Sequence, residues 1–334
     1  MPKSLKEFFD ASPELRIVVY AGKGGLGKTT ASAATAYWFS KRGKKPLCFS
    51  TDPQASLSDI FERDIFGKGV IEVAPSLYVV EIDADKRIAE FQEEVRAKIR
   101  ELYKIEKIPD EIDEYIRTAA AEPAMHESAT YDAMAELLAK GEYDIYIFDM
   151  PPFGHGVRMI SMAQILDAWI DKMEETRRKA AEYEEAVARL KGLSAKTEDE
   201  VLVELREIRR KLDFFRESLT NPKTCAFFMV IIPEKMAILD TERALEMFDK
   251  LGIKLSGIIV NQIYPPSLLE NPNISTFLKN RIEMQQKYMK VIWEKFEEYI
   301  RALVPMFDRE PKGLDMIAKV AEHMFERPWE VDVI

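Results

Sequence analysis

A glycine-rich segment near the start of the chain has the residue types needed to bind a polyphosphate. It follows the apolar run Arg16–Tyr20, precedes the helix-compatible stretch Ala31–Arg42, and has the spacing Gly-x-x-x-x-Gly-Lys-Thr from Gly22 to Thr29. Unobstructed backbone N–H groups, a helix dipole, a lysine and a hydroxyl for Mg²⁺, here that of Thr29, together suit such a ligand. The residues expected to contact it are Gly24, Gly25, Leu26, Gly27, Lys28, Thr29 and Thr30.

Two aspartates follow or end other apolar runs. Asp52 comes shortly after Pro46–Ser50, and Asp149 ends Ile145–Asp149. Because the carboxyl ends of parallel strands form the ligand-binding edge of an open α/β sheet, both aspartates are expected beside the phosphates.

The elements that must position these residues form a repeating strand–helix pattern. Six apolar runs alternate with helical stretches along the chain. This pattern predicts an α/β fold with a doubly wound, mostly parallel sheet. These runs are Arg16–Tyr20, Pro46–Ser50, Leu77–Glu81, Ile145–Asp149, Cys225–Ile232 and Ser256–Asn261. Two stretches without an expected strand, 83–141 and 157–221, are interpreted as insertions that make an all-helical subdomain. We therefore expect residues 1–334 to form one interrupted domain rather than two modules.

The second insertion has the pattern of a long helical hairpin. Apolar or small residues recur in steps of three and four on both sides of a break at 192–194. From Asp171 to Ser218, 25 of 48 residues are charged, 12 basic and 13 acidic. Two interpretations remain open: a solvated, ion-paired hairpin with only a structural role, or an arm that contacts a partner.

Composition excludes several classes of protein. The net charge of −10 argues against a general nucleic-acid binder. No run approaches the roughly 18 apolar residues of a membrane span, so insertion into a membrane is not expected. Cys48 and Cys225 are the only cysteines, and each lies in an apolar run. We expect them to be buried, small hydrophobic residues in a protein of the reducing cytoplasm.

Lys23 and two further segments carry a resemblance to a known family. The loop reads K-G-G-L-G-K-T-T from Lys23 to Thr30 and resembles the deviant Walker A motif of dimeric ATPases in the SIMIBI class of P-loop NTPases. Residues 50–61, STDPQASLSDIF, resemble switch I of the branch that contains the arsenite-pump ATPase and the targeting ATPase for tail-anchored membrane proteins. Residues 144–158, DIYIFDMPPFGHGVR, resemble its switch II. The resemblance extends from Arg16 to about Phe325.

The resemblance implies a homodimer that hydrolyses ATP with Mg²⁺. Its catalytic residues would be Asp52, which positions or activates the attacking water, Lys28, and Lys23, which reaches the nucleotide of the partner subunit. Thr29 would bind Mg²⁺, and Asp149 would support that site without binding the ion directly.

The same resemblance places the nucleoside late in the chain. Glu234 is implied as a nucleotide contact, and Asn261, leaving a strand, suits hydrogen bonding to adenine. The segment Pro305–Leu314 resembles the loop that closes over the base, which adds Pro305 and Phe307 to the expected contacts.

The sequence also departs from this family. Ser275 and Leu278 align with the cysteines through which two subunits of the targeting ATPase share zinc, so no zinc site is expected. The metalloid-binding cysteines of the arsenite pump have no counterpart, which argues against stimulation by arsenite. Residues 54–55 also differ from the family's usual switch I.

Three functions therefore remain open. The first is a targeting chaperone that holds a hydrophobic membrane-protein client, for which apolar residues between Met159 and Met173 could begin a binding surface that then gives way to the charged hairpin. The second is an ATPase that drives an arsenite transporter. The third is a nucleotide-switched assembly protein that binds a soluble partner protein through the helical hairpin.

Overall fold

A computed structural model describes residues 3–50, 56–120, 123–150, 170–172, 174–176, 178–179 and 200–329. Strands in these ranges form one eight-stranded sheet with the order β3-β4-β2-β5-β1-β6-β7-β8. Neighbouring strands are parallel except β3 and β4, which form an antiparallel pair. The strands are β1 (Ile17–Ala21), β2 (Pro46–Ser50), β3 (Ile71–Ala74), β4 (Leu77–Glu81), β5 (Ile145–Asp149), β6 (Cys225–Ile231), β7 (Leu255–Ile263) and β8 (Ile300–Pro305).

The doubly wound α/β fold expected from the sequence is confirmed, with two strands added. All six expected strands are present, and β2, β4 and β5 have the expected bounds. The sequence pattern missed β3 and β8. Strand β3 has only four residues and one buried side chain at the sheet edge, so it lacks an apolar run. Strand β8 follows a helix with no loop between them and carries Arg301 in its apolar run.

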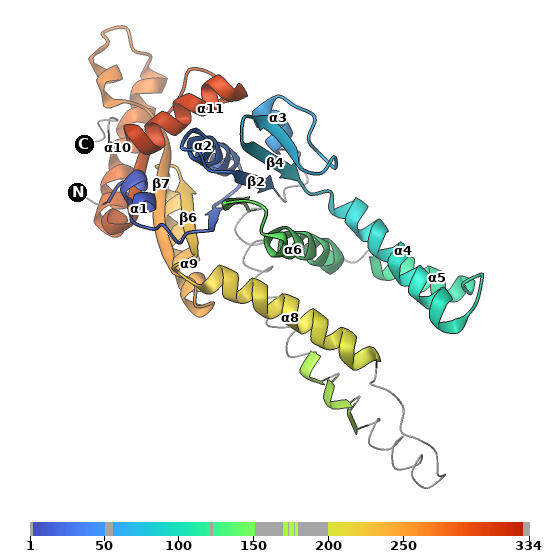
Figure 1. The fold of residues 1–334 in the computed structure, drawn as a ribbon. Helices are drawn as coiled ribbons and strands as arrows, with labels where there is room; N and C mark the ends of the chain where they lie inside the picture. The colour runs from blue at the N-terminus through green and yellow to red at the C-terminus, as the bar shows by residue number, and fades with distance from the viewer. Residues whose placement is uncertain are drawn as a thin grey trace, which may run out of the picture.

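Helices cover both faces of the sheet (Figure 1). They are α1 (Leu5–Asp10), α2 (Lys28–Lys41), α3 (Ser56–Phe61), α4 (Ala84–Tyr103), α5 (Asp110–Ala120), α6 (Pro123–Lys140), α8 (Glu200–Thr220), α9 (Lys235–Lys250), α10 (Thr276–Phe296) and α11 (Gly313–Ala321), with the short turns η1 (Pro266–Glu270), η2 (Glu297–Tyr299) and η3 (Glu322–Glu326). Buried residues of α6, α8, α9 and α10 pack on one face, and those of α1, α2, α3 and α11 pack on the other. Strand β1 supplies both cores, since Ile17 and Val19 face the first and Val18 and Tyr20 the second.

The described residues of the two expected insertions are mainly helical, and we refer to these helices as the helical subdomain. Described residues of the first insertion form α4, α5 and α6, and α8 belongs to the second. These helices extend to one side of the sheet (Figure 1). Phe215 and Leu219, from the expected seam of α8, are buried in the core beneath the sheet.

One side of the expected hairpin is partly described. Residues 170–172, 174–176 and 178–179 are helical. Arg209 on α8 pairs with them, its Nη2 atom 2.5 Å from Asp171 Oδ1 and its Nη1 atom 3.4 Å from Glu174 Oε2. The expected break at 192–194 lies outside the described residues. Within the described ranges, no helix combines the length and the apolar character needed to cross a bilayer.

Candidate active site

The glycine-rich loop connects β1 to α2 at the carboxyl edge of the sheet. Gly27 is the N-cap of α2 and has a left-handed backbone, with φ of 96°. A Cβ atom at this position would lie 2.2 Å from Nδ2 of Asn261, so a side chain fits neither the backbone nor the space. Gly22 is similarly constrained, because a Cβ atom there would lie 2.6 Å from the carbonyl oxygen of Val230. The loop is therefore packed so closely against β6 and β7 that positions 22 and 27 require glycine.

Lys28 begins α2 and is almost completely buried, with 6% of its surface exposed. Its Nζ atom donates to the carbonyl oxygen of Lys23, 3.2 Å away. The ammonium therefore lies across the loop that surrounds the expected phosphate position. A buried cation there provides the charge that a polyphosphate requires.

Thr29 and Asp149 form the central polar contact of the site. Thr29 Oγ1 donates to Asp149 Oδ2 over 2.6 Å, and Ser50 Oγ donates to the same oxygen over 3.3 Å. Strand pairing places Asp149 at this end of the sheet, because Asp149 on β5 is in register with Tyr20 on β1 and with Ser50 on β2. Asp149 is only 2% exposed.

These oxygens suit a divalent cation. Mg²⁺ prefers hard oxygen ligands and is usually bound by few protein groups together with water and substrate phosphates. The hydroxyl of Thr29 could provide such a ligand, with the Asp149 carboxylate orienting it. The residues present therefore fit the Mg²⁺ site expected from the sequence.

Lys23 has a different environment from Lys28, although both belong to one loop. Its side chain is 55% exposed, and its Nζ atom lies 4.0 Å from Oδ2 of Asp240 on α9. Asp240 is also 3.9 Å from Arg243 Nη1 through its other carboxylate oxygen. Such exposed contacts are weak and easily exchanged. The Lys23 side chain is thus far more exposed at the surface than that of Lys28.

The expected catalytic Asp52 lies outside the described residues, as does the part of the expected switch II that follows Met150. The residues that flank Asp52 are described. Ser50 ends β2, Ser56 begins α3, and their Oγ atoms are 3.3 Å apart. Ser50 and Ser56 therefore both belong to the polar cluster around Asp149.

Asn261 and Gln262, at the end of β7, support the loop from behind. Asn261 Nδ2 donates to the carbonyl oxygen of Leu26 over 2.9 Å, and Gln262 Nε2 donates to that of Gly25 over 3.4 Å. Gln262 adopts a left-handed backbone, with φ of 56°, which is uncommon for a residue with a side chain. Asn261 was expected to contact adenine; the contact that the structure describes is with the loop itself.

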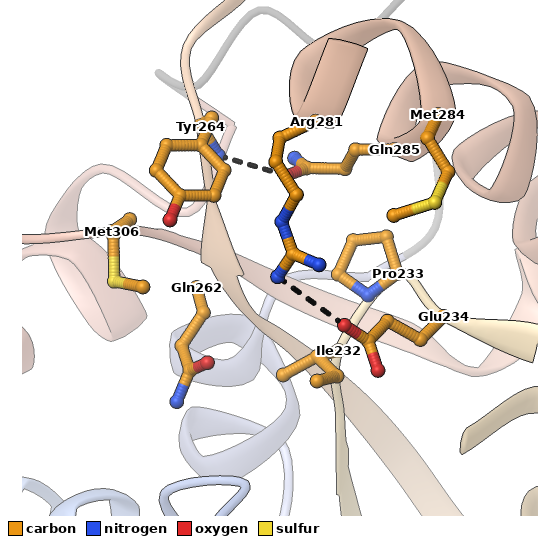
Figure 2. Close-up of a pocket in the computed structure, with 9 residues that line it drawn as sticks. All are labelled: Ile232, Pro233, Glu234, Gln262, Tyr264, Arg281, Met284, Gln285 and Met306. Carbon is orange, nitrogen blue, oxygen red and sulfur yellow. Dashed lines mark hydrogen bonds and ion pairs between the residues drawn. The ribbon is translucent and has the colours of Figure 1, made fainter. Parts of the chain in front are cut away.

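A pocket opens beside this part of the loop (Figure 2). It is lined by Ile232, Pro233, Glu234, Gln262, Tyr264, Arg281, Met284, Gln285 and Met306. Glu234, an expected nucleotide contact, pairs with Arg281 of α10 at 3.4 Å between Oε1 and Nη2. The pocket combines apolar walls with charged and amide groups, as ligand sites do.

The expected base-closing loop contributes to the pocket through a different residue from those expected. Met306 lines the pocket, and its backbone N–H donates to the carbonyl oxygen of Ile263 over 2.8 Å. Pro305 ends β8. Phe307 packs against the core, with its ring in edge contact with that of His323.

Sequence reasoning missed Ser50, Gln262 and Arg281. Ser50 stands directly before Thr51 and Asp52 and could have been found as a polar residue at the end of an apolar strand. Gln262 follows Asn261, but only the left-handed backbone turns its side chain toward the loop. No local pattern connects Arg281 with Glu234, because 47 positions separate them.

Comparison with known proteins identifies the family. A family model described as anion-transporting ATPase matches residues 15–326. The chain belongs to this family. It is accordingly an ATPase, as the sequence resemblance implied. A protein of Aquifex aeolicus provisionally named arsenical pump-driving ATPase 1 is 30% identical over 317 residues, which cover 93% of this chain and 79% of that protein.

Other relatives of this ATPase have eukaryotic sources. ATPase get3 of Schizosaccharomyces pombe is 26% identical over 332 residues, covering 98% of this chain and 96% of the relative. An ATPase ASNA1 homolog of Dictyostelium discoideum is 27% identical over 323 residues, covering 96% and 92%. The similarity therefore includes the helical insertions as well as the nucleotide loop.

The two cysteines of this ATPase are buried, as expected from the sequence. Cys48 lies on β2 and Cys225 on β6. Burial raises the pKa of both thiols well above their usual range, and for Cys48 the neighbouring Asp149 and Glu81 carboxylates raise the pKa further. Ser275, which aligns with one of the family's zinc-binding cysteines, caps α10, because its Oγ atom accepts from the N–H of Leu278 at 3.2 Å.

Proposed function

We propose that this ATPase is a homodimeric switch that binds and hydrolyses MgATP in one domain with a helical subdomain. The observation that carries the proposal is the 2.6 Å hydrogen bond from Thr29 to the buried Asp149. It supports a role in which Thr29 binds Mg²⁺ and Asp149 orients Thr29. The ion would neutralise charge on the phosphates during hydrolysis.

The remaining loop residues would bind the substrate. Gly24, Gly25, Leu26 and Gly27 would offer backbone N–H groups to the phosphates, while buried Lys28 would pair with them and Thr30 would complete the first turn of α2. Asp52 would orient the attacking water. Glu234, Asn261, Pro305 and Phe307 remain the proposed contacts of the nucleoside end.

Lys23 would act across the dimer. Its exposed side chain and weak pairing with Asp240 support this role, since it can leave Asp240 at little cost when another molecule approaches. In the partner's site it would stabilise charge that develops as the terminal phosphate is transferred.

Mixing two inactive variants tests this arrangement. Lys23→Ala and Lys28→Ala should each lose ATP turnover as homodimers. An equimolar mixture should recover up to about a quarter of the wild-type rate, because half the dimers are mixed and each contains one complete site. Full activity of Lys23→Ala alone would exclude Lys23 from any site. Mixed dimers without recovered activity would place Lys23 in the site of its own chain.

For the client, we favour a hydrophobic segment of a membrane protein. The supporting observation is that three large apolar side chains are exposed on separate helices of the helical subdomain: Phe91 on α4, Ile112 on α5 and Phe214 on α8. Their exposure would suit a hydrophobic client. The surface expected between Met159 and Met173 includes residues outside the described ranges.

Co-expression with a tail-anchored protein, followed by copurification, tests this choice. A complex should form with the wild type and be weakened when Phe91, Ile112 and Phe214 are all changed to Ser. Met247→Ser, at an exposed apolar site on α9 outside the subdomain, is the control. If no complex forms, and removal of residues 171–218 releases a soluble partner, the protein is instead a nucleotide-switched assembly protein and not a chaperone for membrane proteins.

A further inference from the structure

Strand β7 contains a bulge next to the glycine-rich loop. Val260 pairs with Leu303 of β8 and Ile263 with Pro305, so three steps along β7 correspond to two along β8. One extra residue is therefore accommodated at positions 261–262. The packing agrees, because Val260 and Ile263 are buried in the same core, whereas residues three apart on a regular strand face opposite sides.

The backbone of Gln262 is strained at this bulge. Its φ of 56° is left-handed, which is uncommon for a residue with a Cβ atom and costs free energy. Consecutive residues of a regular strand point to opposite faces, yet Asn261 and Gln262 both donate to the glycine-rich loop. The strained conformation thus redirects the Gln262 side chain, and the chain returns to the sheet at the buried Ile263.

The two side chains hold two successive peptide groups of the loop. Asn261 Nδ2 lies 2.9 Å from the carbonyl oxygen of Leu26, and Gln262 Nε2 lies 3.4 Å from that of Gly25. In a planar trans peptide, the C=O and N–H bonds point in opposite directions. Because both carbonyl groups face β7, the N–H groups of Leu26 and Gly27, which belong to the same two peptides, face away from β7.

Stability does not explain the arrangement at Gln262. A hydrogen bond of 3.4 Å is long, and its net contribution is no larger than the cost of a left-handed backbone. Glycine or asparagine would adopt this conformation at lower cost. Figure 2 shows the Gln262 amide turned away from the neighbouring ion pair of Glu234 and Arg281. Strain that is retained beside a binding loop indicates a functional role.

We propose that Gln262 is a positioning residue for phosphate binding: by holding the carbonyl group of Gly25, it directs the N–H of Leu26 toward the phosphates. This inference rests on the proposed function, in which the loop binds the phosphates of ATP. Loop N–H groups bind phosphate in the ground state and in the transition state alike. Gln262 therefore acts on nucleotide affinity and on KM, and it has little effect on kcat.

Two substitutions separate the amide donor from the length of the side chain. Gln262→Asn keeps the amide but is one methylene shorter, so it cannot reach Gly25. Gln262→Met keeps the length and removes the donor. Each should raise the Kd for MgADP and the KM for MgATP about threefold to tenfold, which is the effect of one lost hydrogen bond. Calorimetric titration and steady-state hydrolysis measure these values, and kcat should stay within about twofold of wild type.

Thermal unfolding distinguishes a positioning role from a purely structural one. Gln262→Asn should have a thermal midpoint at or above that of the wild type, because asparagine adopts a left-handed backbone more readily. Lys104→Asn is the matched control, since Lys104 is an exposed residue with φ of 51° at the end of α4. Its midpoint should also stay at or above the wild-type value, and its Kd and KM should not change.

Two results would overturn the role of Gln262. One is a Gln262→Asn variant with a lower thermal midpoint and an unchanged Kd for MgADP, which would show a purely structural residue. The other is a Gln262→Met variant that binds MgADP as tightly as the wild type, which would show that the amide donor is not needed.

Lys28→Ala separates this inference from the proposed function. If Lys28→Ala binds MgADP as tightly as the wild type, the loop does not bind phosphates and the proposed function fails. If Lys28→Ala loses affinity while both Gln262 variants keep it, only the role of Gln262 fails.

Discussion

The edge of the sheet that carries the phosphate loop and the helical subdomain are held together by different kinds of polar contact. At the edge, the hydroxyls of Thr29 and Ser50 donate to one oxygen of the buried Asp149. In the subdomain, Arg87 of α4 pairs with Asp132 and Glu136 of α6, and these side chains are more exposed. The first contacts are shielded from water, and the second are screened by it.

This difference has a functional consequence. A buried carboxylate tolerates few arrangements, so the residues around Asp149 form one specific site. Exposed ion pairs contribute little to stability and can be exchanged without loss of the fold. The nucleotide edge can therefore keep one chemistry while the helical surface is free to suit the proposed client or partner.

The largest expected effect is at the edge. Lys28→Ala should reduce ATP turnover at least about a hundredfold, because the buried ammonium is the charge closest to the expected phosphates. Steady-state hydrolysis and binding of a fluorescent ATP analogue would measure the loss of rate and of affinity. Turnover within a few-fold of wild type would show that the contacts at the edge are no more essential than those in the subdomain.

The next largest effect is expected at Gly27, and Gly25 of the same loop provides the comparison. Gly27→Ala should cost stability and nucleotide affinity, since it combines strain at φ of 96° with a Cβ atom 2.2 Å from Asn261 Nδ2. Gly25→Ala should show only the backbone strain, about 1–2 kcal/mol, because no atom lies within 4 Å of its Cβ position. Thermal unfolding and nucleotide binding measure both. Adding Asn261→Ala should partly rescue Gly27→Ala, and no rescue would refute the clash.

A smaller effect is expected in the helical subdomain. Hydrogen bonding to Asp132 raises the pKa of Arg87, so this guanidinium stays charged at all ordinary pH values. Arg87→Met should lower the thermal midpoint by only about 2 °C, because such exposed pairs are worth about 1 kcal/mol or less. The difference from wild type should shrink in high salt, and kcat should not change. A large loss of kcat would show that the ion pair of Arg87 with Asp132 affects the active site.

The smallest effect should come from the cysteines. Because burial raises the pKa of Cys48 and Cys225, the folded protein has almost no thiolate at pH 8, and a thiol reagent should label it only after denaturation. Arsenite should likewise leave the ATPase rate unchanged. Rapid labelling of the folded protein, or clear stimulation by arsenite, would contradict the assignment of both cysteines to the core.

The phosphate loop was predictable because its requirements are local. Spacing from Gly22 to Thr29, after an apolar run and before a helix, already specified both the loop and its ligand type. The missed strands β3 and β8 lack such a signal, one being too short and the other continuous with a helix. Glu234 and Arg281 could not be paired from sequence, since their contact depends on how α10 packs against the turn between β6 and α9.

The sequence by itself determined the α/β class, the phosphate-binding loop, the family resemblance and the burial of the two cysteines, because each follows from residue types at short spacing. Only the tertiary structure decided which residues surround the loop. Register between β2, β4 and β5 brings Ser50, Glu81 and Asp149 to one edge, and Asn261 reaches the loop from 235 positions away. Such contacts arise from the packing of distant strands, which no local pattern encodes.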